Sequence, residues 1–432
     1  MIKQLMLMGI LTTLTSGYAY AADQTNNSKE SQIQLAKLQQ LQTEVDELQA
    51  QLNPPTQSKA APFTLANKTL RSTIYLDNNV EHTYLEGLSS STRALSLLQV
   101  RNKFGNNAMV LGGEIETDTQ IWWGDKMTVV NQDDGLTTIE NGSGTYLTGA
   151  NLDLLYNLGQ WLQIYFETIT YQDSNGIETD AESAFVTLGN LDKSPFFATM
   201  GKGRPMFGTL PGAPWAASIE QGLFRPGYIN NITLGYNEGN FITNFTYISP
   251  SANHSTFLVD SFYSYDIPDT KWTLGGNIGY VNDINGTGMG IAATDNADTS
   301  RTPAVNVEGN IAWKEFTVYS GWESTLRNNT ALDENGLSGV WYIQGVYAPE
   351  ILGKETTFSA SYAQSYNMSG VYFPMASSAG EPLSIIGPHQ QFYVFVSRNV
   401  LDSVILSLEY AWIKTYDNQE NNTITFDTIM YF

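Results

Sequence analysis

Acidic side chains recur at alternate positions along several stretches of the sequence that are otherwise rich in apolar residues. Such alternation is typical of a β-strand, on which every second side chain points to the same face. A wall of carboxylates attracts cations. If these strands enclose a water-filled space, the carboxylates would form an inner wall that favours cations. The alternative is that they only hydrate the inner surface of that space, as in any water-filled lumen. The eight carboxylates predicted to line this wall are Glu114, Glu116, Asp118, Asp153, Glu167, Glu308, Glu323 and Glu409.

Basic residues are scarce, 21 against 43 acidic ones, so the few that gather are informative. Lys202 and Arg204 alternate at the end of one stretch, and Arg225 lies near the end of the loop that follows. That loop, 206–226, is too apolar for a solvated surface loop, and we expect it to fold inward as a constriction. A loop packed on a barrel rim or at a subunit interface is the alternative. Because Arg pairs bidentately with carboxylates, these three basic residues and Trp215 are the predicted binding set for an anionic ligand.

The sequence offers little for catalysis, for a cofactor or for a metal. It has only three histidines and no cysteine. His254 adjoins Ser255, but neighbours on a strand point to opposite faces, so the two would not form a catalytic pair. We therefore expect no enzyme. The net charge of −22 also argues against a nucleic acid as a partner.

From about residue 68 onward, runs of roughly 8–12 residues alternate in polarity and end in turn residues. The clearest are 272–280, 305–313 and 404–412. A carboxylate on the inner side of such a strand would need a partner in a dry sandwich, but not in a wet lumen. We predict an all-β chain, a transmembrane antiparallel outer-membrane β-barrel of about 16–18 strands. The strands count to 18, with 16 as the alternative, and 68–77 and 94–101 are the least regular.

Connections between the runs alternate between short turns and long loops, which is typical of short periplasmic turns and long outer loops. Trp161, Trp272 and Trp313 lie beside short turns, where a periplasmic aromatic girdle belongs. The last alternating run ends at Phe432, which resembles the terminal signal read by the barrel assembly machinery. The predicted outer loops are 119–145, 205–227, 283–302 and 367–389.

The part of the chain before the barrel divides into three segments. Residues 1–21 have the charged start, short apolar run and small-residue end of a signal peptide. Residues 22–53 carry leucines at heptad spacing and predict a periplasmic α-helical coiled coil; a lone amphipathic or partly disordered helix is the alternative. Residues 54–67 form a Pro-containing linker, and 68–432 the barrel. A heptad seam and a porin-like barrel are compatible with a homotrimer in the outer-membrane lipid.

This layout resembles the siderophore porins of Legionella, the legiobactin-receptor type, over the whole chain. The most specific part is 201–236, with the motif Gly-Lys-Gly-Arg-Pro-Met-Phe-Gly-Thr-Leu-Pro-Gly near its start. The resemblance implies iron uptake, with a ferric siderophore crossing the outer membrane independently of TonB. It carries no established site residues to this sequence.

The length of chain before the barrel agrees with this reading. Fewer than about 50 residues separate the predicted signal from the first predicted strand, too few for the globular plug of a TonB-dependent receptor. Two other functions stay open. One is a general diffusion porin for small polar solutes, and the other is a barrel anchor for an envelope-tethering coiled coil.

Overall fold

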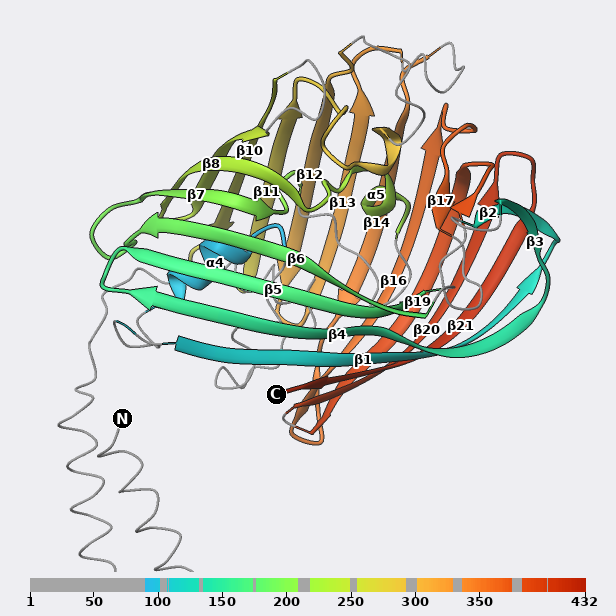
Figure 1. The fold of residues 1–432 in the computed structure, drawn as a ribbon, viewed down its shortest axis with the longest axis horizontal. Coiled ribbons are helices and arrows are strands. Elements are labelled where there is room, and N and C mark those ends of the chain that lie inside the picture. The colour runs from blue at the N-terminus through green and yellow to red at the C-terminus, as the bar shows by residue number, and fades with distance from the viewer. Residues whose placement is uncertain are drawn as a thin grey trace, which may run out of the picture. The chain divides into compact units, whose positions relative to one another are not determined.

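The computed structural model describes residues 90–101, 107, 109–131, 135–173, 176–208, 218–248, 255–292, 301–328, 336–374, 383–401 and 403–432. Sixteen antiparallel strands form a closed ring, in which β1 pairs with both β4 and the last strand β21 (Figure 1). The strands of the ring are β1 (Met109–Gly124), β4 (Gly142–Leu158), β5 (Leu162–Asp173), β6 (Gly176–Gly189), β7 (Phe196–Gly203), β8 (Ile229–Glu238), β9 (Phe241–Ile248), β10 (Thr256–Asp266), β11 (Trp272–Val281), β12 (Ala304–Trp313), β13 (Phe316–Thr325), β14 (Gly339–Tyr347), β16 (Lys354–Tyr366), β19 (Pro388–Leu401), β20 (Val404–Thr415) and β21 (Glu420–Tyr431).

The predicted fold class is confirmed, and the strand number is the lower of the two expected values. The short strand β15 (Glu350–Ile351) pairs only with β16 and adds no further span. The sequence count of 18 was too high at the start of the chain. Residues 94–101, predicted as a strand, lie mostly within the helix α4 (Arg93–Gln99). Residues 68–77 lie outside the described residues, as do the predicted signal peptide, coiled coil and linker.

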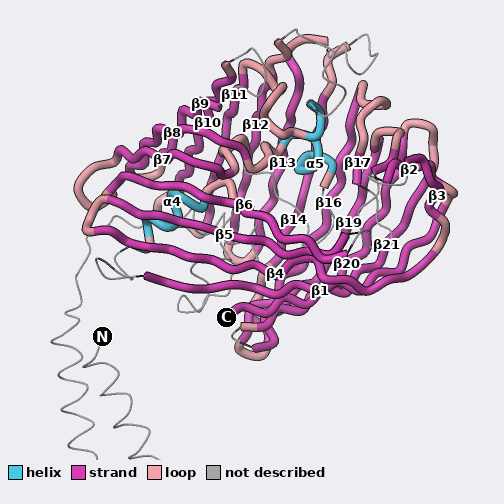
Figure 2. The backbone as a smooth tube through the Cα atoms, viewed as in Figure 1, coloured by secondary structure: helices cyan, strands magenta, loops and turns pink. Residues whose placement is uncertain are grey.

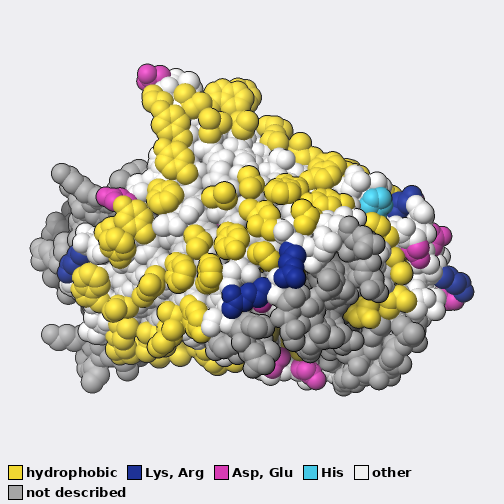
Figure 3. All heavy atoms as spheres, turned by 90° about the horizontal axis from the view of Figure 1, so that it is seen from above, with side chains coloured by type: hydrophobic (Ala, Val, Ile, Leu, Met, Phe, Trp, Pro, Cys, Tyr) yellow, Lys and Arg dark blue, Asp and Glu magenta, His cyan; other side chains and the backbone are white. Residues whose placement is uncertain are grey.

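The strands form because their alternating residues suit an apolar exterior and a polar interior. On β12, Val307 and Ile311 are exposed while Asn306, Glu308 and Asn310 are buried inside. The same rule holds around the ring, so hydrophobic side chains spread over the outer wall and charged ones are few there (Figure 3). Such an apolar outer band is what a lipid bilayer requires of a spanning barrel. None of the helices in the described part of the chain is long and apolar enough to cross a membrane.

Turn lengths alternate as predicted around most of the ring, but at the long-loop end β5 and β6 are separated by only two residues and β20 and β21 by only four. At one end of the ring the strands join through tight turns such as Gly159 and Gly239, both in the left-handed region at φ +59°, and Lys314 at φ 54°. Trp272 and Trp313 stack beside two of these short turns, with ring centroids 5.9 Å apart. At the other end lie long connections, which carry the small strands β2 (Met127–Asn131), β3 (Gly135–Ile139), β17 (Phe373–Pro374) and β18 (Leu383–Ser384). These pair into a second sheet that joins the loop after β1 to the loop after β16.

The last residue of the chain completes the ring. Phe432 donates its backbone N–H to the Gly113 oxygen over 3.0 Å, and the Gly113 N–H returns a 3.1 Å bond. Its aromatic ring covers Gly113, where an added Cβ would come within 2.4 Å of the ring. A glycine at position 113 therefore makes room for the terminal phenylalanine at the seam.

Two short helices lie inside the ring of strands (Figures 1 and 2). One is α4, from the segment before β1, and the other is α5 (Ile219–Phe224), from the connection between β7 and β8. The largest hydrophobic core gathers around α5 and includes Phe224, Phe207 and Phe373. The barrel interior is therefore packed with hydrophobic side chains around α5.

Candidate functional site

The connection between β7 and β8 crosses the lumen. Its helix α5 contacts β14, β16 and β19, which lie on the opposite side of the ring from β7. Ser218 caps the helix by accepting a 3.4 Å bond from the Gln221 N–H, and the Ile219 N–H donates to Gln391 Oε1 on β19 over 2.8 Å. Ile219 and Leu223 are fully buried. The inward fold expected of 206–226 is present in its described parts, while 209–217, including Trp215, lie outside the described residues.

The start of this connection is held against the wall by a close backbone approach. The Gly208 N–H donates to Asp260 Oδ1 over 3.0 Å. Gly208 has φ +79°, and an added Cβ would lie 2.6 Å from Asn306 Nδ2. Only glycine combines this backbone conformation with so little space. Gly208 therefore allows the start of the loop that crosses the lumen to pack closely against the barrel wall.

All eight predicted wall carboxylates lie on the inner face of the ring. Six are buried and two, Glu114 and Glu116, are half-buried. Glu308 accepts a 2.8 Å bond from the Tyr342 hydroxyl, and Glu323 accepts a 2.8 Å bond from Asn306 Nδ2. The inner face of the ring is therefore rich in carboxyl groups, some of them hydrogen-bonded to neighbouring side chains.

The helix α4 brings an arginine into the lumen that sequence reasoning missed. Arg93 is 5% exposed, forms an ion pair with Glu167 and donates to the Tyr165 hydroxyl over 2.9 Å. Tyr165 in turn donates to Asp153 Oδ1 over 2.7 Å. At the other end of the segment, Arg101 donates to the Gly159 oxygen over 2.7 Å, beside the turn between β4 and β5. The signal in the sequence was a pair of arginines eight residues apart, which flank a segment that is apolar at 94, 95, 97 and 98.

Of the three predicted basic residues, Arg204 and Arg225 lie near each other and Lys202 lies apart. The Arg204 guanidinium lies over the Tyr228 ring, 4.3 Å from its centroid. Burial, and then the neighbouring charge of Arg204, lower the pKa of Arg225 to about 9, which leaves it charged at neutral pH. Tyr228 also hydrogen bonds with Glu182 on β6. Arg204, over the Tyr228 ring, and Arg225, within electrostatic reach of it, make up a cationic cluster, which Glu182 partly offsets.

Lys202 does not join that cluster. It lies opposite Asn230 on β8, and both alternate with inward-facing residues such as Thr199 and Asn231. Its ammonium donates to the Ala181 oxygen over 2.6 Å in an exposed position. Lys202 therefore belongs to the outer face of the wall. Strand pairing ends at Gly203, so the direction of Arg204 is not set by the same alternation.

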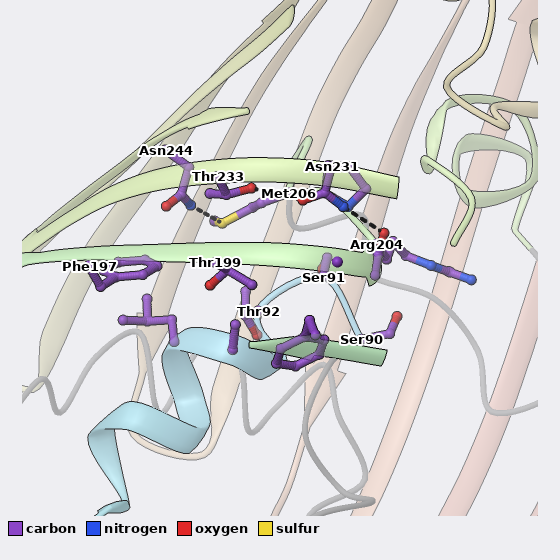
Figure 4. Close-up of a pocket in the computed structure, with 16 residues that line it drawn as sticks. Ser90, Ser91, Thr92, Phe197, Thr199, Arg204, Met206, Asn231, Thr233 and Asn244 are labelled. Atoms are coloured by element: carbon purple, nitrogen blue, oxygen red, sulfur yellow. Dashed lines mark hydrogen bonds between the residues drawn. The ribbon is translucent and has the colours of Figure 1, made fainter. Parts of the chain in front are cut away.

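A small cavity separates α4 from the wall formed by β6 to β9 (Figure 4). Its volume of about 50 Å³ is room for a few water-sized groups. Figure 4 shows Arg204 at one end, with Thr199, Thr233 and Asn244 along the wall. The Nε of Arg204 is buried and has no hydrogen-bond partner among the described residues. In Figure 4 the guanidinium of Arg204 extends away from the other labelled residues, so the cavity borders the base of this side chain rather than its charged end.

These features define a porin-like outer-membrane β-barrel: the strands form a closed antiparallel ring, its outer face is apolar, its inner face is polar, and a loop crosses the lumen. Within that class, the chain belongs to a family described as a protein of unknown function (DUF3573), which matches residues 75–309.

Known proteins similar to this chain are distant in sequence. The UPF0422 protein lpp3030 of Legionella pneumophila (strain Paris) is 25% identical over 272 residues, covering 59% of this chain and 48% of that protein. The chain thus spans about half the length of the curated relative it matches. The structure of OprB from Pseudomonas putida matches at 8% identity and TM-score 0.50, over 79% of this chain and 96% of that one. An anion-selective porin from Comamonas acidovorans matches at 12% identity and TM-score 0.48, over 76% and 100%.

Proposed function

We propose that the chain is an outer-membrane channel whose constriction admits carboxylate-bearing solutes, and that the solute is a ferric siderophore. One observation carries the proposal. Arg204, over the Tyr228 ring, and Arg225, within electrostatic reach of both, lie at the two ends of a loop that crosses the lumen. A solute that passes this loop must pass the cationic cluster.

The charges of the lumen favour a chelate over a bare anion. Two guanidiniums held close together attract carboxylates, and each can bind one bidentately. The surrounding wall carboxylates repel a free anion. A ferric chelate carries both a cation and carboxylates, so it offers a group for each sign of charge. The resemblance of 201–236 to the Legionella siderophore porins supports the same class of solute.

We also propose that transport is independent of TonB. Within the part of the chain that the structure describes, the lumen holds the short helices α4 and α5 and their loops. The expected separation of fewer than about 50 residues between the signal and the first strand needs correction, because α4 occupies 93–99 and the first described strand starts at Met109. A seven-residue helix is far smaller than the globular plug of an energy-coupled receptor.

The second candidate is a general diffusion porin, favoured by the closed 16-strand ring itself. The two candidates differ in selectivity. A general porin passes sugars and antibiotics at rates set by size, while the proposed channel passes the ferric chelate faster than uncharged solutes of equal size.

Uptake of radio-iron siderophore by cells that rely on this protein tests the proposal. A charge-assisted contact contributes roughly 1.5–3 kcal/mol, so Arg204→Ala or Arg225→Ala should weaken chelate binding about tenfold or more, and the double variant further. Lys202→Ala is the matched control, because it removes a nearby cation from the outer face. Undiminished uptake by the double variant at equal expression would remove the two arginines from the function.

A further inference from the structure

The two ends of the barrel wall, β1 and β21, meet at a cluster of three carboxylates. Asp118 and Asp427 are direct partners across this seam, and Glu116 precedes Asp118 by two residues on the same face. Carboxylate oxygens of the three residues all lie within 4.8 Å of one another. The register of β1 with β4 shifts between Glu116 and Thr117, an irregularity of the kind that re-aims a side chain.

Bringing these three carboxylates together destabilises the fold unless a cation or protons offset their negative charge. Asp118 and Asp427 are 0% and 1% exposed. Like charges directly opposite each other in a sheet are destabilising, and buried carboxylates this close cannot all be ionised without a compensating charge. The cluster therefore needs either a bound cation or shared protons.

Asp427 provides a second, independent observation. Both of its carboxylate oxygens are buried and have no hydrogen-bond partner among the described residues. Ser407, opposite it on β20, lies near this carboxylate but directs its hydroxyl proton to Ser397 over 3.0 Å. A fully buried carboxylate is rarely left without a partner in a folded protein. Its oxygens are thus directed at the other two carboxylates with unused coordinating capacity.

Neutral oxygens surround the same place. Gln120, two residues beyond Asp118, donates its amide N–H to Thr425 over 3.1 Å, which leaves its buried Oε1 without a partner in the described structure. Thr148 donates its hydroxyl to Oδ2 of Asp118. Hard cations of the Ca²⁺ type take six to eight oxygen ligands from carboxylates, amide carbonyls and water, with flexible geometry. The donors at this seam are all of that kind.

We propose that Glu116, Asp118 and Asp427 bind a divalent cation, Ca²⁺ in preference to Mg²⁺, at the seam where the first and last barrel strands join. The site lies on the wall and uses none of the arginines of the constriction. Its bound cation stabilises the closed ring by bridging β1 and β21, and it offsets part of the negative charge of the lumen.

Calorimetric titration of the folded full-length protein with Ca²⁺, after removal of metals by a chelator, tests the site. We expect one strong binding event per chain, a higher unfolding midpoint with Ca²⁺, and a weaker effect of Mg²⁺. Asp427→Asn should weaken Ca²⁺ binding about tenfold or more. Glu323→Gln, a matched loss of one buried carboxylate elsewhere on the inner wall, should leave Ca²⁺ binding unchanged.

A second readout separates a cation site from a purely structural role. With chelator present, Asp427→Asn should unfold at a higher temperature than the unaltered protein, because one repelling charge is gone; with Ca²⁺ the order should reverse. If Asp427→Asn fails to assemble, Glu116→Gln should show the same two effects. Absence of Ca²⁺ binding at millimolar concentration, or equal binding by Asp427→Asn, would overturn the proposal in favour of shared protons.

Discussion

At the scale of single residues, alternation in the sequence predicts which way a side chain faces as long as the strand is regular. The eight wall carboxylates lie on the inner face for this reason. Lys202 and Arg204 show where the rule stops, because β7 ends at Gly203 and only the strand imposes alternation. Gly201, at φ +143°, also departs from regular extended geometry. The end of a strand is set by pairing with its neighbour, which the sequence of one strand does not contain.

Arg93 and Glu167 form a buried ion pair that should hold α4 in the lumen. Their side chains are 6% and 1% exposed. Removing one partner leaves the other charge buried and alone, which costs about 3–5 kcal/mol, so Arg93→Ala should release 90–101. Faster hydrogen exchange in that segment, with the strands still protected, is the expected result. In Arg93→Ala/Glu167→Ala the loss of stability should be smaller than the sum of the single losses; an additive loss would show that the pair is not coupled.

Glu220 should make the seating of α5 depend on pH. Burial, and more weakly the nearby Glu308, raise the pKa of Glu220 to about 7. Because the folded pKa lies above the ordinary value, the stabilising contribution is complete below about pH 4.5 and is lost as pH rises through about 7. After correction for the intrinsic exchange rate, amides of 218–224 should exchange faster at pH 8.5 than at pH 5.5. Glu220→Gln should remove this difference, and a difference that persists would assign it to another group.

At the scale of elements, the strands could be predicted and the lumenal helix α4 could not. Apolar–polar alternation is dictated by lipid outside and water inside, so it appears in every regular strand. The residues of α4 are apolar at 94, 95, 97 and 98, a spacing that fits a short strand or a short helix. Tertiary contacts stabilise the helix: Leu95, Leu97 and Leu98 are buried, and Arg93 forms an ion pair with Glu167.

Phe432 should be needed to complete the terminal strand. Its backbone makes the last two hydrogen bonds of the seam with Gly113. Deleting Phe432, or replacing Gly113 with Leu so that the ring is displaced, should lower the amount of heat-modifiable barrel in the outer membrane. Met430→Leu, an apolar exchange on the outer face of the same strand, is the control. Wild-type levels of barrel without Phe432 would show that the terminal residue has no such role.

At the scale of the whole molecule, composition and turn lengths were sufficient for the class of fold, and the interior was only partly predictable. The sequence indicates an inward loop because 206–226 is too apolar for solvent, and α5 does cross to the opposite wall. It does not indicate that Arg204 lies over the Tyr228 ring, or that Arg225, separated from Arg204 by a loop, comes within electrostatic reach of both. That contact depends on the path of the loop across the lumen, which follows from packing against β14, β16 and β19.

The central claim is that a solute crossing the lumen passes a cationic cluster that recognises carboxylates. The most direct measurement is ionic current through the purified protein in a planar bilayer as ferric citrate, a ferric carboxylate chelate, is added. The chelate should reduce the current with saturable dependence, and the half-saturating concentration should rise about tenfold or more in Arg204→Ala/Arg225→Ala while Lys202→Ala stays unchanged. A current that does not respond to the chelate, or that responds equally in the double variant, would contradict the claim and leave a general diffusion porin.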